Sequence, residues 1–302
     1  MIPEFPQFKP IEFSDKEEVE KLTYKFSNYS DFNFVSLWSW DIKGEMAISK
    51  LNDNLVVRFT DYLNGQPFFS FIGDKKVNDT AKELIFFSKK YYKKNLLKFI
   101  PEDIAKRLKR EHFQVEIDPD AHDYVYAIDH LVNMHEWKDH SSSKSIRKFL
   151  REHPNYKVKT SSVQKIKKED HIELFEKWAK SKNINNYLEL GEYKSFIRTL
   201  DIKEDSVRVV SLFVDDVLVG FTVFEIVSGG FAISHYAKTD KTYHSKVSDV
   251  LNWEEAKILD AHGVKYFNWE QDLGLPGLRR SKEKYKPILL LKKVTVSEKK
   301  KM

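Results

Sequence analysis

The chain has 302 residues, of which 41% are hydrophobic and 14% aromatic, so it can bury a large core and a mostly disordered chain is excluded. Its 51 Lys and Arg residues nearly balance 46 Asp and Glu, and the net charge of +5 is too small to indicate nucleic-acid binding by itself. The absence of cysteine excludes structural disulfides, thiolate catalysis and Cys-ligated zinc.

The distribution of charge and the character of the N-terminus say more than the totals. Residues 1–150 carry 23 basic and 24 acidic side chains, whereas residues 151–302 carry 28 and 22. We therefore expect a phosphate-bearing partner to meet the second half. The N-terminal segment has neither a basic region nor a continuous apolar run, and no apolar stretch approaches the roughly 18–20 residues of a membrane helix. These features predict a cytoplasmic protein without a transmembrane segment.

Hydrophobic spacing and turn residues predict regular elements throughout the first half. The expected elements are a helix at 15–26, a buried aromatic segment at 32–40, strands at 55–60 and 68–72, a helix from a capping box at Thr80 to about Lys94, a further strand, a helix led by Pro101, and a strand pair at 113–117 and 124–128. The half therefore contains helices together with antiparallel strands.

The second half repeats this order. Its expected elements are a helix at 170–182, strands at 207–214, 217–227 and 231–237, a helix from about 247 to 262 closed by Gly263, a strand at 264–269 and a final strand at 288–296. The polar residues 130–150 mark the junction. Short matches between Leu55–Thr60 and Leu218–Phe224 leave an internal duplication open, because alternating apolar strands resemble one another in any protein.

Signatures of several common enzyme classes are missing from the sequence. There is no phosphate-binding GxxxxGK[ST] loop, no GxGxxG fingerprint, no GxSxG elbow and no HExxH pair. The histidines between residues 122 and 140 lack metal-ligand spacing, so no metal site is predicted. The serines at 141–145 favour a solvated hinge with a serine N-cap over a phosphate cradle, and this stretch leads into a basic helix.

The residues Asn268–Pro287, NWEQDLGLPGLRRSKEKYKP, combine both signs of charge at a strand-to-helix corner, and we call them the charged motif. A strand ending at Trp269 would deliver Glu270 and Asp272 to the carboxyl edge of a sheet, where α/β folds usually bind ligands. If the segment is extended, side chains two residues apart point the same way. The two carboxylates are therefore expected to share one site.

The second part of the charged motif supplies cations. A Gly/Pro turn at 274–277 precedes a predicted helix, on which Arg279 and Lys282 share a face because they are three residues apart. An anionic ligand could bind at such a helix start. The alternative is a surface helix whose basic face pairs with carboxylates of the same chain.

The charged motif resembles the phosphatidylglycerol lysyltransferase C-terminal domain family. The matching letters are Asn268, Glu270, Asp272-Leu273-Gly274, Gly277-Leu278-Arg279, Lys282, Tyr285 and Pro287. Weaker similarity covers Phe32–Trp40, Asp123–Tyr126, Ile146–Phe149 and Lys238. The resemblance implies an α+β fold of two tandem GNAT-like domains with mixed sheets flanked by helices, related to Fem-type aminoacyl ligases. The expected domains are 1–135 and 136–302, with the active site in the second.

The resemblance also implies an aminoacyl- or acyltransferase. Its donor would be aminoacyl-tRNA or acyl-CoA, with tRNA as a partner and no tightly bound cofactor. The acceptor, whether a small molecule, a lipid or a peptide, is not identified by the sequence. The expected catalytic residues are Asp272, Lys282 and Glu270, and the expected substrate- or phosphate-binding residues are Arg279, Arg280, Lys238, Asn268 and Tyr285. A carboxylate would hold or deprotonate the acceptor, and Lys282 with Arg279 would stabilise the oxyanion.

Two alternatives stay open at this stage. The chain could be a non-catalytic basic module that binds RNA or an acidic partner, because Ser142-Ser143-Lys144 replaces a basic run of the family. It could also be a CoA-dependent N-acyltransferase. No glycine occurs between Ala237 and Val250, however, and a pyrophosphate-binding loop usually needs one for close backbone approach, which disfavours acetyl-CoA.

Overall fold

A computed structural model describes residues 1–138, 140–242 and 247–299 of the chain, which form two compact units. The first unit contains Met1–Tyr124, Gln271–Lys284 and the described residues from Leu289 onward. The second contains Val125–Glu270 and Tyr285–Ile288. The units therefore do not follow the continuous ranges 1–135 and 136–302 of the prediction, because the chain returns to the first unit near its end.

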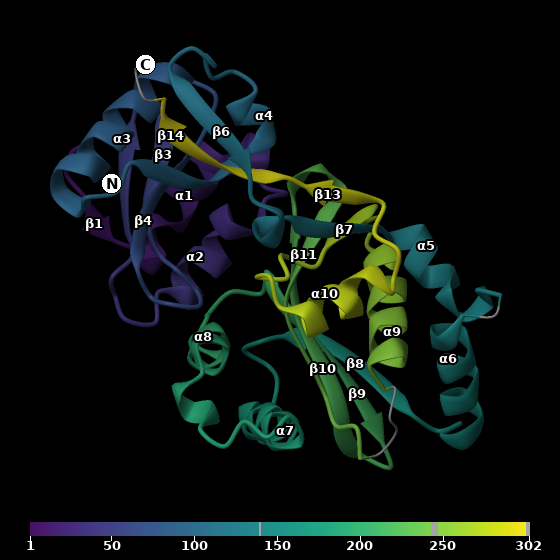
Figure 1. Cartoon of the computed structure of the whole chain (residues 1–302). Coiled ribbons are helices and arrows are strands. Elements are labelled where there is room, and N and C mark those ends of the chain that lie inside the picture. The colour runs from purple at the N-terminus through teal and green to yellow at the C-terminus, as the bar shows by residue number, and fades with distance from the viewer. Residues whose placement is uncertain (139, 243–246, 300–302) are drawn as a thin grey trace. The chain divides into compact units, whose positions relative to one another are not determined.

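The first unit is built on a mixed sheet in the order β1-β2-β3-β4-β5-β14-β6 (Figure 1). Its strands are β1 (Lys9–Pro10), β2 (Ala47–Leu51), β3 (Asn54–Thr60), β4 (Pro67–Ile72), β5 (Leu96–Pro101), β6 (Phe113–Ile117) and β14 (Lys293–Glu298). Its helices are α1 (Lys16–Thr23), α2 (Phe34–Trp40), α3 (Val77–Tyr92), α4 (Glu102–Ala105) and α10 (Pro276–Glu283), and β13 (Leu289–Leu291) is a further short strand. Strands β4 and β5 are parallel and joined by α3, as a parallel pair requires a crossover.

Aromatic residues fill the core of the first unit. The predicted buried segment at 32–40 is confirmed as largely buried and forms α2, whose start is capped by the side chain of Asn33 accepting from the Ser36 N–H at 3.1 Å. The rings of Phe32 and Phe59 meet edge to face with centroids 5.6 Å apart. Strand β3 is buried on both faces, which explains its run of Leu, Val and Phe.

The second unit pairs its strands in the order β7-β12-β11-β10-β9-β8. Its strands are β7 (Asp123–Ala127), β8 (Lys157–Ser162), β9 (Val207–Val214), β10 (Val217–Val227), β11 (Phe231–Thr239) and β12 (Tyr266–Asn268). Its helices are α5 (Ile128–Val132), α6 (Ser141–Glu152), α7 (Lys168–Ser181), α8 (Gly191–Leu200) and α9 (Val247–Ala261). Figure 1 shows α9 on one side of these strands and α7 with α8 on the other.

Each unit thus combines antiparallel strands with one parallel pair joined by a helix, β4-α3-β5 in the first and β11-α9-β12 in the second. The predicted α+β class with mixed sheets flanked by helices is confirmed. The predicted strand pair 113–117 with 124–128 is wrong, because β6 pairs with the C-terminal strand β14 and β7 pairs with β12. The prediction paired two strands that are close in sequence, whereas the partner of β6 is β14, near the other end of the chain.

Two local predictions are also wrong. Helix α3 begins at Val77 after a left-handed Lys76, so Thr80 lies inside the helix and not at its cap. Helix α6 begins at Ser141, and Ser142 and Ser143 are buried within it, so this stretch is no solvated hinge. The serine hydroxyls find partners inside the fold, and the cap is instead supplied by the preceding histidine side chain.

Candidate functional site

The first unit contains one group of predicted site residues, centred on Asp272 in the loop before α10. This carboxylate has no exposed surface. It accepts hydrogen bonds from the hydroxyl of Tyr124 at 2.7 Å, from the backbone N–H of Gly274 at 2.8 Å, and from Nε and Nη2 of Arg279 at 2.7 and 3.0 Å. The lone pairs of Asp272 are therefore largely occupied.

The electrostatics of Asp272 agree with this geometry. Burial alone would raise the pKa of the carboxyl, but the hydrogen bonds from Arg279, Tyr124 and Gly274 outweigh it and lower the pKa below its usual value. A carboxylate held ionised by four donors is a poor proton acceptor. Asp272 therefore anchors the loop, and this differs from the predicted role as a base.

Arg279 completes a closed ion-pair network. Its Nη2 also donates to Asp120 at 2.6 Å, and the hydrogen bonds to Asp272 and Asp120 raise the pKa of the guanidinium. The backbone carbonyl of Asp120 accepts from Leu273 N–H at 3.1 Å. Gly274 has a left-handed φ of 71°, which favours glycine, and a Cβ there would also lie 2.7 Å from the Asp120 carboxylate. Arg279 thus pairs with carboxylates of its own unit, as the surface-helix alternative expected.

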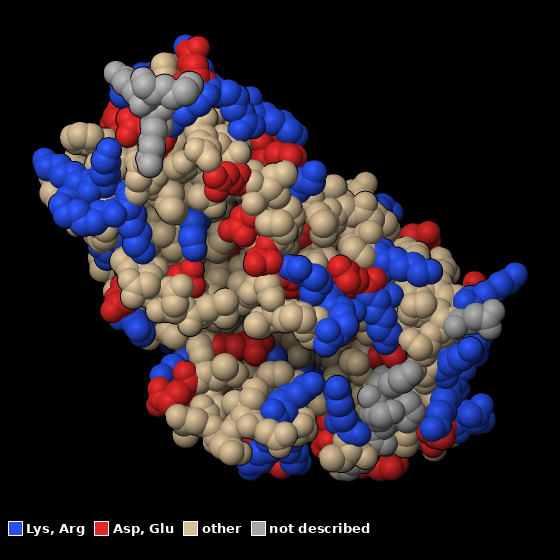
Figure 2. All heavy atoms as spheres, in the orientation of Figure 1, with Lys and Arg blue, Asp and Glu red and all other residues tan. Residues whose placement is uncertain are grey.

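The other two cations of α10 differ from each other. Lys282 is buried, and its ammonium donates to the backbone carbonyl of Gln271 at 2.5 Å and lies 5.7 Å from the ring centre of Tyr124. Arg280 is exposed, and Figure 2 shows Lys and Arg side chains on the surface where α10 lies. Arg280 is therefore better placed than Lys282 to meet an anion from solvent.

The second unit contains a different charged group, where the parallel pair β11–β12 ends. Residues Phe231–Ile233 lie opposite Tyr266–Asn268, and β11 then continues to Thr239 without β12 beside it. On its other side β11 contains a β-bulge, since the register with β10 shifts and His235 is the extra residue. Bulges re-aim side chains and occur next to active sites.

His235 lies between two carboxylates, and we call Glu225, His235 and Glu270 the bulge cluster. Its Nε2 is 3.4 Å from Glu225 Oε2, and its Nδ1 is 3.5 Å from Glu270 Oε1. Burial would lower the pKa of His235, but the two carboxylates raise it to about 9. The imidazole is therefore protonated at neutral pH.

The backbone conformation of Glu270 sets the direction of its side chain. Its φ of 57° is left-handed, which is rare for a residue other than glycine, and its N–H donates to the Asn268 side-chain oxygen at 2.6 Å. The expectation of an extended segment with Glu270 and Asp272 pointing the same way is therefore wrong. Glu270 meets His235 in the second unit, whereas Asp272 meets Arg279 in the first.

The remaining predicted residues of the second unit are buried and partnered. Lys238 donates to Glu192 at 2.6 Å and lies 4.0 Å from the ring centre of Trp178. Tyr285 donates its hydroxyl to Asp249 at 2.7 Å, and burial together with Asp249 raises its pKa. Both side chains brace the unit, so a phosphate could reach the Lys238 ammonium only by displacing a carboxylate.

Sequence reasoning missed His235 and Glu225. Both lie within apolar strands, FAISHYAKT and VLVGFTVFEIV, where a single polar residue is an available signal. The bulge that turns His235 toward Glu270 depends on pairing between two strands, and no residue type in FAISHYAKT marks it.

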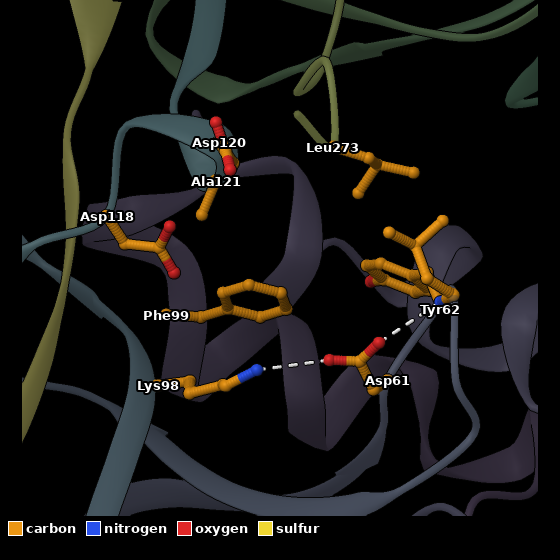
Figure 3. A pocket seen from close by; sticks show the side chains of 9 residues that line it. Asp61, Tyr62, Lys98, Phe99, Asp118, Asp120, Ala121 and Leu273 are labelled. Carbon is orange, nitrogen blue, oxygen red and sulfur yellow. Dashed lines mark hydrogen bonds and ion pairs between the residues drawn. The ribbon is translucent and has the colours of Figure 1, made fainter. Parts of the chain in front are cut away.

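A pocket of about 180 Å³ lies in the first unit (Figure 3). Its lining consists of Asp61, Tyr62, Leu63, Lys98, Phe99, Asp118, Asp120, Ala121 and Leu273. Lys98 donates to Asp61 at 3.1 Å, and the Phe99 ring stands between this pair and Asp118. Phe99 has a left-handed φ of 58° at a bulge of β5, so this pocket is lined by a strained aromatic residue.

Metal and membrane features can be assessed for the described part of the chain. Within residues 1–138, 140–242 and 247–299, no three His, Asp or Glu side chains are grouped so that they could hold a metal ion. Across the same ranges, no helix has the length and apolar character needed to cross a bilayer. The predicted loop without glycine before α9 includes residues 243–246, which lie outside the described residues.

Comparisons with solved structures show the fold. A conserved protein of unknown function from Bacteroides thetaiotaomicron is 23% identical, with 99% of this chain and 100% of that chain covered and a TM-score of 0.83. L-PGS from Bacillus licheniformis is 13% identical, with 100% and 95% covered and a TM-score of 0.62. FemX is 11% identical, with 96% of each chain covered and a TM-score of 0.57. The predicted tandem GNAT-like fold is confirmed.

Sequence comparison gives the family. A comparison with curated protein sequences gives no match. The family model described as phosphatidylglycerol lysyltransferase, C-terminal, matches residues 25–296, which confirms the resemblance seen in the charged motif. The chain therefore belongs to the phosphatidylglycerol lysyltransferase C-terminal family and has an aminoacyltransferase fold.

Proposed function

We propose that the chain is an aminoacyltransferase that moves an aminoacyl group from aminoacyl-tRNA to an amine or hydroxyl acceptor. The observation that carries the proposal is Glu270, a carboxylate presented at the end of a parallel strand beside a protonated histidine. Ligands of sheet proteins commonly bind at the carboxyl ends of parallel strands. Glu270 is the proposed catalytic base.

Glu270 suits this role better than Asp272, the other carboxylate of the charged motif. The side chain of Glu270 is 21% exposed, whereas that of Asp272 is 0% exposed and accepts four hydrogen bonds. A base must reach the proton that it removes. We assign Asp272, Arg279 and Lys282 to holding the loop that directly follows Glu270.

One carboxylate is enough to carry out both proton transfers of the proposed reaction. The acceptor nitrogen or oxygen forms a bond to the ester carbonyl carbon, and the bond from that carbon to the ribose oxygen of the tRNA breaks. Glu270 takes the proton from the acceptor and gives it to the departing ribose oxygen. Asn268 supports this step because its side chain fixes the backbone N–H of Glu270.

The donor class follows from the relatives. The matching family is named for lysyl transfer to phosphatidylglycerol, and L-PGS and FemX share the fold over nearly the whole chain. Aminoacyl-tRNA is therefore the proposed donor. Arg280 is an exposed side chain of the charged motif that could meet a tRNA phosphate, whereas the predicted phosphate ligand Lys238 is paired with Glu192.

The test measures transfer from a mixture of charged tRNAs carrying labelled amino acids to phosphatidylglycerol vesicles and to peptide amines. We expect the wild-type chain to label one of these acceptors and Glu270→Gln to lose roughly 10²-fold or more in kcat, the usual contribution of a general base. Glu283→Gln, which changes an exposed carboxylate on α10, is the control and should keep full activity.

Two results would contradict the proposal. The assignment of Glu270 fails if Glu270→Gln turns over at the wild-type rate. The donor assignment fails if the wild-type chain transfers nothing from any charged tRNA while acyl-CoA supports labelling of the same acceptors. A thermal-shift series with CoA would accompany that second outcome.

A further inference from the structure

The bulge in β11 has a specific effect on His235. Ile233 is the last β11 residue opposite β12, and the bulge falls directly after it, between Ser234 and Tyr236. His235, the extra residue of the bulge, therefore lies beside the segment that directly follows β12. This is where Glu270 follows Asn268, so the bulge brings the imidazole to the carboxylate.

Both ring nitrogens of His235 face acids, and these acids come from different elements. Glu225 approaches Nε2 from β10, and Glu270 approaches Nδ1 from the segment after β12. Both acids raise the pKa of the ring. A neutral ring would carry one N–H between two carboxylates, so the cluster favours the imidazolium, whose positive charge lies between the two acids.

The exposure of the cluster falls from one end to the other. The side chains of His235 and Glu225 are buried, whereas Glu270 is partly exposed. Glu225 therefore has no direct route to a ligand, and its negative charge stabilises the imidazolium that meets Glu270. Such an arrangement orients an accessible carboxylate with a buried cation, and it holds that cation with a second buried acid.

We infer that His235, backed by Glu225, is the positioning residue that orients the Glu270 carboxylate for acyl transfer. The inference rests on the proposed function of Glu270. His235 and Glu225 are both buried, so neither is placed to touch the reacting atoms. The imidazolium fixes Glu270 at neutral pH and releases it when the ring loses its proton.

The first test does not depend on activity. Histidine ring signals of the full chain are titrated by NMR, with His235→Gln to assign the signal and the exposed His262 as an internal reference. We expect His235 to titrate near pH 9 in the wild type and at least one pH unit lower in both Glu225→Gln and Glu270→Gln. A wild-type titration near 6.5, or one that either substitution leaves unmoved, overturns the inference.

The second test is the pH profile of transfer. In the wild type we expect kcat to hold up to about pH 9. In Glu225→Gln the alkaline loss should begin at least one pH unit lower, so that kcat falls about fourfold at pH 8.5 while KM stays within twofold. Glu225→Asp should restore most of the wild-type profile.

The possible outcomes separate the two proposals. A purely structural role for the bulge cluster would lower the melting temperature and leave the pH profile of the remaining activity unchanged, which overturns the inference. If Glu270→Gln is inactive and Glu225→Gln keeps the wild-type profile, the inference fails and the proposed function stands. If the wild-type chain transfers nothing, the proposed function fails, and the NMR titration still decides whether His235 is held between the two acids.

Discussion

In each unit a buried cation lies between two carboxylates, and the surroundings of these two clusters differ. In the first unit Lys293 donates to Asp31 and, at 2.7 Å, to Asp123. All three side chains are essentially unexposed. Further donors occupy lone pairs of these two carboxylates, since Tyr62 donates to Asp31 and Ser30 donates to Asp123. This buried lysine cluster is closed to ligands.

The bulge cluster of the second unit has the same order of charges and an open end. His235 stands between Glu225 and Glu270, and only Glu270 reaches solvent. A closed cluster can contribute to stability and specificity alone, because no ligand can replace any member. A cluster with one accessible carboxylate can also act on a substrate. The difference in exposure, more than the residue types, separates the structural group from the proposed site.

The backbone repeats this contrast beside the parallel pair of each unit. In the first unit Leu97 lies opposite β4, and Phe99 comes two residues later. In the second unit Asn268 lies opposite β11, and Glu270 comes two residues later. Both have a left-handed φ, 58° and 57°. The Phe99 ring packs on Phe59 with centroids 5.7 Å apart, whereas the Glu270 carboxylate meets an imidazolium. The same backbone conformation thus directs a ring into the core of the first unit and a carboxylate toward a histidine in the second.

The largest effect is expected when the closed cluster loses its cation. Lys293→Ala leaves Asp31 and Asp123 buried beside each other without a counter-charge, and breaking a buried ion pair in this way costs about 3–5 kcal/mol. Urea denaturation would show a lower free energy of unfolding. Lys292→Ala removes the neighbouring, more exposed lysine and should change that free energy by less than about 0.5 kcal/mol. Equal losses in the two variants would contradict the assignment of Lys293.

A buried acid without a cation gives the second effect. Glu255 on α9 is fully buried, and its Oε1 has no hydrogen-bond partner among the described residues. Burial raises its pKa from 4.5 to about 8, with a small opposing contribution from the Thr222 hydroxyl. The folded state therefore binds the proton more tightly, so the stability that protonation supports is lost as pH rises from about 4.5 through 8.

The check is the variant Glu255→Gln, which keeps the shape and removes the charge. Between pH 5 and pH 8 the wild type should lose roughly 3 kcal/mol more stability than Glu255→Gln, because each pKa unit corresponds to about 1.4 kcal/mol. His235 titrates over an overlapping range in both proteins and cancels in the difference. Parallel stability curves for the two proteins would show that Glu255 is neutralised in some other way.

The third effect separates the two carboxylates of the charged motif. Asp272→Asn weakens the charge-assisted hydrogen bonds from Arg279, and a loss of about 2 kcal/mol in stability is expected. Glu270→Gln should cost less than about 1 kcal/mol, since its carboxylate is partly exposed and lies 3.5 Å from His235 Nδ1. Thermal unfolding of the two variants under one condition gives the comparison. A larger loss in Glu270→Gln would reverse the roles assigned to them.

The sequence predicted most elements of both units because their patterns are local. Strands such as Asn54–Thr60 and Val217–Val227 follow from runs of β-branched and aromatic residues, and Gly263 closes α9 as expected. The exchange that places β14 between β5 and β6 was not predictable in this way. Strand partners depend on contacts between residues far apart in the chain, and any buried strand has a similar composition.

The site was predicted only in part for a related reason. The charged motif identified Glu270 and Asp272 by residue type, but the left-handed backbone at Glu270 sends them to different partners. The prediction assumed an extended segment, in which the pair would act together. The members from other elements, such as His235, were missed because their roles arise from a bulge and from burial. Neither the bulge nor the burial of these side chains can be deduced from residue spacing.

The smallest effect on stability concerns a cation that lies outside both clusters. Arg280 is exposed on α10, so Arg280→Ala should change the free energy of unfolding by no more than about 0.5 kcal/mol. Its effect should appear in RNA binding instead. If Arg280 contacts a tRNA phosphate, the slope of log affinity against log salt should fall by roughly 0.7 for the lost contact.

The measurement is binding of uncharged tRNA to the wild type, Arg280→Ala and Arg279→Ala over a range of salt concentrations. Arg279 is engaged with Asp272 and Asp120, so Arg279→Ala should lower stability while changing the salt slope less than Arg280→Ala. An unchanged slope in Arg280→Ala would remove this side chain from the tRNA surface. A larger slope change in Arg279→Ala would mean that its ion pairs open on binding, so that a residue assigned to the closed structural part of the molecule also serves its ligand.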